Sequence, residues 1–136
     1  MSVVEYLQQY GEAARVARQI KREYERELDM IDAIRSPMDG DGTHGSGISR
    51  TVESKATRLA DKAAELSKAW DDAIRVRQEV YKAIRKVPGV AGDVLYERYV
   101  CLRSWDKVAL IVGYSVRHTI RLHNEGIEYL EKNLDI

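Results

Sequence analysis

The chain has 136 residues, with 22 lysines and arginines, 22 aspartates and glutamates, one cysteine and no phenylalanine. This length fits one small structural unit and excludes a large two-domain enzyme. The formal net charge of zero excludes a long-range field that would draw the whole chain to nucleic acid or to an anionic membrane. Any nucleic-acid site must therefore be a local basic patch.

The expected location follows from the cysteine count and the absence of targeting segments. Cys101 has no second cysteine to pair with, and the first residues lack the basic and apolar regions of a signal peptide. No stretch approaches the roughly 18 consecutive apolar residues that a membrane helix needs. We therefore expect a protein of the reducing cytoplasm with no membrane partner.

The first predicted element is a long helix over Val3–Arg35. Ser2 and Glu5 match a capping box at its start. Its end is marked by Ser36 and Pro37, since a proline pushes the preceding residue out of the helical region. Apolar residues recur in between in steps of four and three, with a break at Lys21, and form an apolar stripe on one face: Val3, Leu7, Tyr10, Ala14, Ala17, Tyr24, Leu28 and Ile31.

A glycine-rich segment follows at 37–47. It holds one proline, four glycines and two aspartates in eleven positions, which predicts a flexible loop. Asp39, Asp41 and His44 suggest a cation loop, but the ordered oxygen ligands ending in a bidentate glutamate are missing. A solvated linker is the favoured interpretation.

A second long helix is predicted over about Thr51–Val87. Its stripe has the same spacing as the first and stops before Pro88 and Gly89. The positions of this stripe are Val52, Ala56, Leu59, Ala63, Leu66, Trp70, Ala73, Arg77, Val80, Ile84 and Val87. Two helices of similar length joined by a turn-rich loop predict an antiparallel hairpin over residues 1–87. Because two helices alone bury little surface, we expect the C-terminal helices or a second copy of the chain to cover the remaining apolar side.

The remaining residues, 88–136, predict three short helices. They cover Asp93–Val100, Ser104–Val112 and Ser115 to about Leu134, with a turn at Gly113. No alternating pattern typical of strands appears. The expected fold is therefore all-α, with a long antiparallel helical hairpin followed by a small helix-turn-helix domain.

The helix-turn-helix prediction is based on local signals in register. Ser104 and Ser115 suit the N-cap positions of two helices, and Gly113 suits the sharp turn between them. The small residue expected four positions before the turn is Ala109. The apolar positions of the motif are occupied by Val108, Val112, Tyr114 and Leu122, with a weaker match at Thr119.

The C-terminal third of the chain resembles a known family. The matching residues are Leu95-Tyr96-Glu97-Arg98-Tyr99-Val100, Ser104-Trp105-Asp106-Lys107-Val108-Ala109, Val112-Gly113-Tyr114-Ser115, Arg121-Leu122-His123 and Leu130. Together they resemble the fourth conserved region of bacterial sigma factors and, more closely, the small phage regulators of the ArpU/RinA type. The start of the last helix, Val116-Arg117-His118, departs from the more strongly charged start usual in sigma factors. The resemblance implies a phage or prophage transcriptional regulator that binds double-stranded DNA in a bacterial cell, with RNA polymerase as a further partner.

Candidate DNA-contacting residues lie on the last two predicted helices. Arg117, Arg121 and Asn124 are spaced i, i+4 and i+7 and share one face of the last helix. In this motif that helix enters the major groove, where arginine pairs with guanine and asparagine with adenine. The candidates for phosphate contact lie near the starts of the two helices and are Arg103, Lys107, Ser115 and His118.

The local charge limits this interpretation. From Asp93 onward the chain has six basic and seven acidic residues. We expect a single copy to bind DNA weakly, because affinity at physiological salt needs several phosphate contacts. A homodimer or higher oligomer formed through the hairpin, or RNA polymerase, would supply the missing contacts.

Two other functions compete with this one. A small terminase-like DNA-packaging protein also joins a helix-turn-helix to an oligomerising hairpin, and a non-DNA-binding helical interaction protein would suit the neutral charge. No nucleophile and base set, phosphate-binding loop or carboxylate pair stands out, so we expect no enzyme activity and no cofactor. His118 and His123 lack the spacing of metal ligands, so we expect no metal site.

Overall fold

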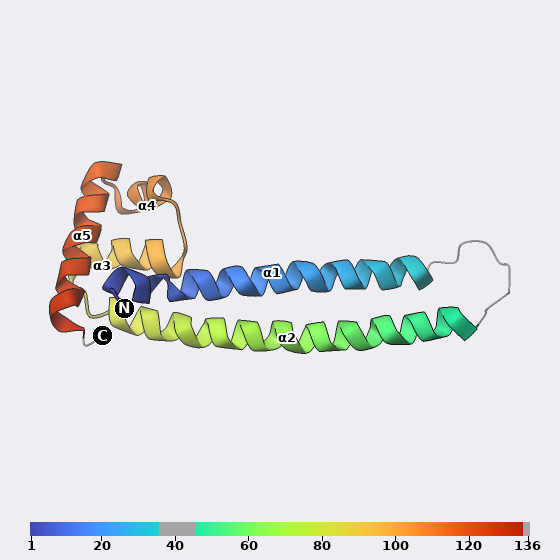
Figure 1. Ribbon diagram of the computed structural model, residues 1–136. Helices are drawn as coiled ribbons and strands as arrows, with labels where there is room; N and C mark the ends of the chain where they lie inside the picture. Colours follow the sequence, from blue (N-terminus) through green and yellow to red (C-terminus); the bar gives the residue numbers. More distant parts are fainter. Residues whose placement is uncertain (36–45, 135–136) are drawn as a thin grey trace. The chain divides into compact units, whose positions relative to one another are not determined.

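The computed structural model describes residues 1–35 and 46–134, with side chains described for 1–33 and 52–134. In chain order the elements are α1 (Val3–Arg35), α2 (Ser46–Ile84), α3 (Gly89–Leu95), the π-helical turn η1 (Tyr96–Val100), α4 (Trp105–Val112) and α5 (Val116–Asn133) (Figure 1). No strand occurs among these residues, which confirms the all-α prediction of two long helices followed by a smaller helical region. Asp39, Asp41 and His44 lie outside the described residues.

Helix α1 has the predicted bounds, and its capping box is confirmed. The Glu5 backbone N–H donates to Ser2 Oγ at 3.1 Å, and the Ser2 backbone N–H donates to Glu5 Oε2 at 3.3 Å. These two bonds satisfy backbone donors that the first turn would otherwise leave without partners.

Helix α2 begins earlier and ends earlier than the predicted Thr51–Val87. It begins at Ser46. The polar and glycine residues between Ser46 and Thr51 gave no periodic signal in the sequence. At its end the Val87 N–H bonds to the Ile84 carbonyl at 3.0 Å, a tighter turn than the α-helical one. The prediction was wrong at this end because Pro88 already constrains the backbone of Val87.

The chain divides into two compact units that do not follow the predicted boundary at residue 87. Residues 1–14 and 72–136 form one, here called the core unit, and residues 15–71 form the other, here called the hairpin unit. Helices α1 and α2 each contribute to both.

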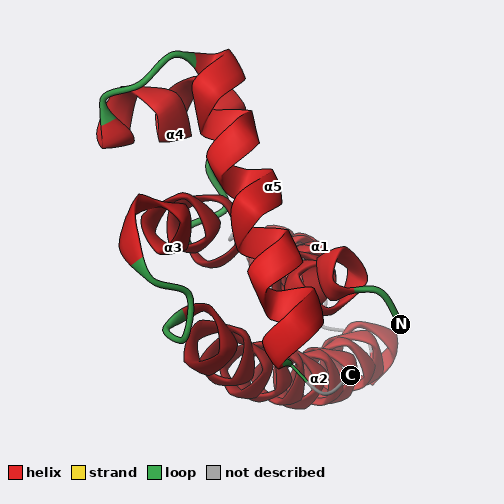
Figure 2. Cartoon of the chain, turned by 90° about the vertical axis from the view of Figure 1, so that its left-hand side faces the viewer, coloured by secondary structure: helices red, strands yellow, loops and turns green. Residues whose placement is uncertain are grey.

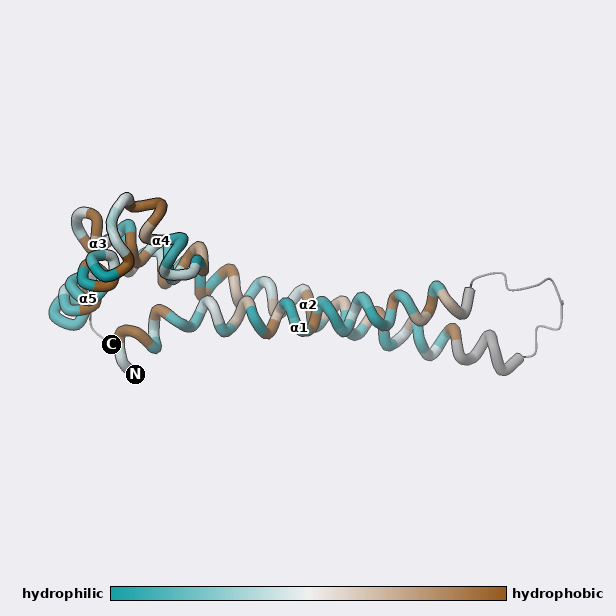
Figure 3. The backbone as a smooth tube through the Cα atoms, turned by 90° about the horizontal axis from the view of Figure 1, so that it is seen from above, coloured by the Kyte–Doolittle hydropathy of each residue, from teal (hydrophilic) through white to brown (hydrophobic). Residues whose placement is uncertain are grey.

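In the hairpin unit, α1 and α2 run antiparallel. Lys62 Nζ lies 2.7 Å from Glu23 Oε2, and Lys55 Nζ lies 4.0 Å from Met30 Sδ. Figure 3 shows hydrophobic and hydrophilic residues alternating along both helices. Ile20, absent from the predicted stripe, is buried, whereas Leu28 is 37% exposed. The facing side therefore shifts around the helix near Lys21, where the predicted pattern broke.

The core unit contains a cluster of buried apolar side chains. It joins the first turns of α1 and the last turns of α2 to the C-terminal helices, which confirms that these helices cover an apolar side of the hairpin. Its members are Val3, Leu7, Val80, Ile84, Val87, Leu95, Tyr99, Val100, Ile127 and Leu130.

Helix α3 and η1 replace the single helix predicted over Asp93–Val100. Helix α3 starts at Gly89, which has a φ of 71°. Within the helix, Gly92 lies so close to the preceding turn that a Cβ there would be 2.5 Å from the Val87 carbonyl oxygen. These glycines therefore permit the structure where the sequence suggested a break. In η1 the Cys101 N–H bonds to the Tyr96 carbonyl five residues back, at 3.1 Å.

Helix α5 packs against both α3 and α4 (Figure 2). Gly126 makes the approach to α3 possible, since a Cβ at this position would lie 2.8 Å from Leu95 Cδ1. Leu95 itself is fully buried. None of the described helices is long and apolar enough to cross a lipid bilayer.

Candidate nucleic-acid interface

Helix α4, a tight turn and helix α5 form the predicted helix-turn-helix. The Ser104 hydroxyl oxygen caps α4 by accepting from the Lys107 N–H at 3.3 Å. Gly113 ends the helix with a φ of 81°, and its N–H and that of Tyr114 both bond to the Ala109 carbonyl. Only glycine adopts this left-handed conformation without steric cost.

The start of α5 is fixed by Ser115. Its hydroxyl oxygen accepts from the His118 N–H at 3.1 Å, which confirms the predicted N-cap. Thr119, the weaker apolar match, is fully buried, and its hydroxyl donates to the Ser115 carbonyl at 2.8 Å. Its polar group is therefore satisfied within the helix, so a threonine serves where an aliphatic residue was expected.

The apolar positions of the motif agree with the prediction in part. Val108 and Ala109 are buried, and Val112 and Leu122 are half-buried. Tyr114 occupies an apolar position of the motif but is 44% exposed. Its ring packs edge-on against His118, with centroids 4.8 Å apart, so this aromatic contact lies on the surface of the motif.

Arg117 and Arg121 are exposed on the first two turns of α5. Neither forms an ion pair within the described part of the chain. The first turn of α5 carries no acidic residue, whereas Glu125, Glu128 and Glu131 follow further along the helix. The positive charge is therefore concentrated at the N-terminal half of α5, where the helix dipole also favours an anion.

Asn124 is exposed on the same face, and part of its hydrogen-bonding capacity is already used. Its Oδ1 lies 3.0 Å from His123 Nδ1. Because an amide oxygen only accepts, this contact places the imidazole proton on Nδ1, and the Tyr99 hydroxyl then donates to Nε2 at 2.7 Å. The amide NH2 of Asn124 remains available to donate to a ligand.

His123 has a structural role, whereas its sequence position was weighed only for metal binding. It is buried, and the Trp105 ring packs edge-on against it with centroids 5.0 Å apart. Burial lowers the pKa of His123, the nearby Arg98 charge lowers it further, and the bond to Asn124 opposes both. The signal available in the sequence was its place four residues from both Thr119 and Ile127, on the buried face of α5.

The four candidates for phosphate contact differ in how many of their polar groups already form bonds within the protein. Lys107 is exposed and forms no ion pair within the described residues. Arg103 is not free in this way, because its Nε donates to Glu97 Oε2 at 2.7 Å. Ser115 uses its oxygen as a cap acceptor, and His118 is half-buried beside Tyr114.

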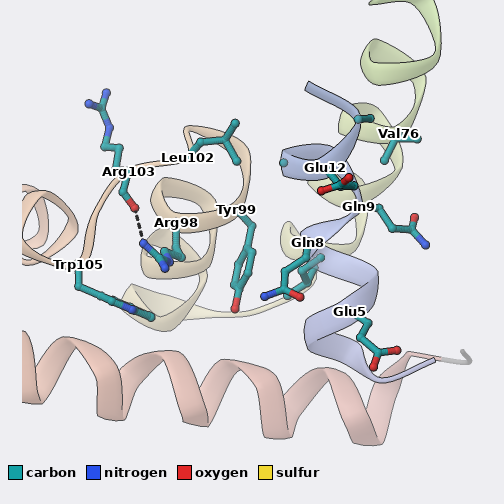
Figure 4. Close-up of a pocket in the computed structure, with 13 residues that line it drawn as sticks. Glu5, Gln8, Gln9, Glu12, Val76, Arg98, Tyr99, Leu102, Arg103 and Trp105 are labelled. Atoms are coloured by element: carbon teal, nitrogen blue, oxygen red, sulfur yellow. Dashed lines mark hydrogen bonds between the residues drawn. The ribbon is translucent and has the colours of Figure 1, made fainter. Parts of the chain in front are cut away.

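A groove of about 1070 Å³ lies elsewhere in the core unit, between the start of α1 and the segment from η1 to α4 (Figure 4). Arg98 Nη1 donates to the Arg103 carbonyl at 2.8 Å, and the Arg98 guanidinium lies 4.6 Å from the centre of the Trp105 ring. Both arginines at this groove are therefore engaged by the protein itself. Lys107 of α4 and the arginines Arg117 and Arg121 of α5, by contrast, form no ion pair within the described residues.

Among the residues with described side chains, no group of three or more histidines, cysteines, aspartates or glutamates could hold a metal ion. Comparisons of the chain with protein-family models, with curated proteins and with solved structures find no match.

Proposed function

We propose that this protein is a DNA-binding transcriptional regulator that inserts the N-terminal half of α5 into the major groove. The observation that carries the proposal is the pair Arg117 and Arg121 on the second helix of a helix-turn-helix, both exposed and without an ion pair to any described residue. Two cations one turn apart, next to a helix N-terminus without acids, suit a polyanion with base acceptors in its groove.

The proposal gives each candidate residue a role. Arg117 and Arg121 contact guanine edges, and Asn124 donates its free NH2 to a base acceptor. Lys107, Ser115 and His118 contact phosphates at the two helix starts. Arg103 contributes through the guanidinium N–H groups that its bond to Glu97 leaves over.

The setting follows the resemblance to phage regulators of the ArpU/RinA type. The protein would act in the cytoplasm of a bacterial cell on phage or prophage genes. Since residues from 93 onward contain more acids than bases, a second copy of the chain or RNA polymerase would add the contacts that a single motif lacks.

The test is selection of bound fragments from bacterial and prophage DNA with the purified chain at two salt concentrations. The double variant Arg117→Ala/Arg121→Ala should lose the enriched sites, with binding at least about tenfold weaker, because each bidentate arginine to guanine pair discriminates by about 1–3 kcal/mol. The variant Lys82→Ala/Lys86→Ala is the matched control, since it removes the same charge from exposed positions on α2 and the turn after it. Equal loss in both variants, or no enrichment at low salt, would refute direct DNA recognition.

A second candidate function, protein contact, is favoured by helix α4. Leu110 is 74% exposed and Ile111 is 45% exposed on this helix. Exposed apolar side chains grouped on one element are typical of an interaction surface. DNA affinity that is absent at every salt concentration would favour this candidate. Ring-sized assemblies in light scattering, together with sites beside packaging genes, would favour a DNA-packaging protein.

A further inference from the structure

Two exposed apolar side chains lie among the proposed DNA-contacting residues of α5. Val116 and Ile120 are each 36% exposed, and they are spaced i and i+4 over the first two turns of the helix. Side chains with this spacing lie on the same side of a helix. Val116 directly precedes Arg117, and Ile120 directly precedes Arg121.

Ile120 shares the surface formed by the candidate polar residues. At 3.6 residues per turn, Ile120 lies about 60° around the helix axis from Arg117 and about 40° from Asn124. Val116 is the first residue of the helix, directly after the Ser115 cap. A groove that receives the two arginines would therefore also receive these apolar groups.

Local helix stability does not account for valine and isoleucine at these positions. β-Branched side chains lose rotamer freedom in a helix, and their propensity is lower than that of alanine, leucine or glutamate. Each side chain leaves 36% of its surface exposed, so packing within the fold does not use all of its apolar area. Further along α5 the exposed positions carry mostly charged or polar residues, such as Glu125, Glu128 and Lys132, as a solvated helix requires.

We propose that Val116 and Ile120 contact the C5 methyl groups of thymines, so that the protein recognises sites in which thymine neighbours guanine. The thymine methyl is the apolar feature that a base pair presents in the major groove, and aliphatic side chains are its usual partners. Adjacent residues on one helix then contact adjacent bases, the arginine a guanine and its apolar neighbour a thymine. This inference rests on the proposed function and specifies its preferred sequence.

The test replaces thymine by deoxyuridine, which removes only the methyl group. Duplexes are first selected from a random pool with the wild-type chain, and each thymine of the selected site is then replaced in turn. Loss of one buried methyl contact should weaken wild-type binding about fourfold. The same replacement should have no effect on the Ile120→Ala or Val116→Ala variant at the thymine that each residue contacts.

Two further variants guard this result against a general loss of structure. Ile120→Leu retains an apolar side chain and should retain sensitivity to deoxyuridine. Ile74→Ala removes an isoleucine of α2 that is 51% exposed and should leave both affinity and deoxyuridine sensitivity unchanged. Thermal unfolding followed by circular dichroism checks that each variant is folded.

The outcomes separate the two proposals. If no duplex is selected, the proposed function itself fails. If duplexes are selected but deoxyuridine weakens wild type and the alanine variants equally, or weakens neither, thymine recognition by Val116 and Ile120 is refuted.

Discussion

His123 makes the stability of the core unit depend on pH. Its imidazole is buried between the Tyr99 hydroxyl, the Asn124 amide and the Trp105 ring, and the positive charge of Arg98 acts on it. Burial lowers its pKa below the ordinary value of 6.5, so the folded state holds the neutral form. Above pH 6.5 the histidine is mostly neutral in the folded and unfolded states alike. As the pH falls below 6.5, His123 binds a proton in the unfolded chain but stays neutral in the folded chain until its lower pKa is reached.

The free energy of unfolding should therefore fall as the pH is lowered from 7 through 6.5 toward the pKa of folded His123. Urea unfolding at a series of pH values measures this decline in the wild type. The His123→Gln variant should show a shallower decline over the same range, because the group that titrates is gone. Identical slopes for the two proteins would contradict this assignment.

Single residues differ in how far the sequence alone could place them. The caps at Ser2, Ser104 and Ser115 were predictable, because a cap depends on a hydroxyl and on backbone within three residues. The ion pair of Arg103 with Glu97 spans an irregular segment whose backbone path the sequence does not reveal. The exposure of Tyr114 was not predictable, because it depends on how closely α4 and α5 pack, which no local pattern specifies.

Among the elements, the contact between α3 and α5 depends on Gly126. A Cβ at this position would lie 2.8 Å from Leu95 Cδ1 and 3.2 Å from Leu95 Cγ. Leu95 is fully buried and has little room to move. Gly126→Ala should therefore destabilise the protein by about 1–3 kcal/mol through overpacking, although alanine is the better helix former by about 1 kcal/mol.

Urea unfolding of Gly126→Ala measures the effect, and the double variant Gly126→Ala/Leu95→Ala tests its cause. Without the leucine methyl groups the added Cβ has space, so the glycine substitution should cost less in the Leu95→Ala background. An equal cost in both backgrounds would show that contact with Leu95 is not the reason. Additivity is expected to fail here because the two residues touch.

The elements were predictable where a periodic pattern of apolar residues marks them. They were not predictable where close packing of the backbone determines them. The apolar stripe and the boundary signals of α1 predicted its bounds correctly. The turn at Gly113 predicted where α4 ends and where α5 begins. The start of α3 was missed because Gly89 and Gly92 resemble helix breakers, whereas Gly92 is needed for close approach to Val87. The π-helical turn η1 has no compositional signature, so it was counted as ordinary helix.

At the scale of the whole molecule, the two compact units differ in how much apolar surface they bury. The core unit contains the cluster that includes Leu7, Val80 and Leu130, all fully buried. In the hairpin unit the described stripe residues of α2, such as Leu59 and Leu66, are only half-buried. Backbone amides should therefore open more readily in the hairpin unit.

Hydrogen exchange followed by mass spectrometry tests this difference. The backbone amides of peptides from residues 15–33 and 52–71 should exchange at least about tenfold faster than those of peptides from α5. The Leu130→Ala variant, which we expect to cost about 2–5 kcal/mol, should raise exchange in the core unit. Equal protection of both units in the wild type would contradict the expected difference.

The grouping of residues 1–14 with 72–136 could not be predicted. The apolar stripe predicts that two long helices face each other, but it does not tell which of its residues are also covered by other elements. Val3 and Val80 belong to stripes that look alike along their length, yet these residues also join the cluster with Leu95 and Ile127. That information is tertiary, and the C-terminal helices supply it.

In the π-helical turn η1, the number of residues matters as much as their identity for the direction in which each side chain points. A π-turn accommodates one residue more than an α-helical turn, so the residues after it lie about 100° less far around the axis than the same sequence would place them in a plain helix. Tyr99 lies within this turn, where its hydroxyl reaches His123 Nε2. A deletion of one residue between 96 and 100 would restore regular helical spacing and turn Tyr99 away. Homologous chains that differ by one residue here would therefore need a different partner for that histidine, whereas substitutions at the exposed positions nearby would be tolerated.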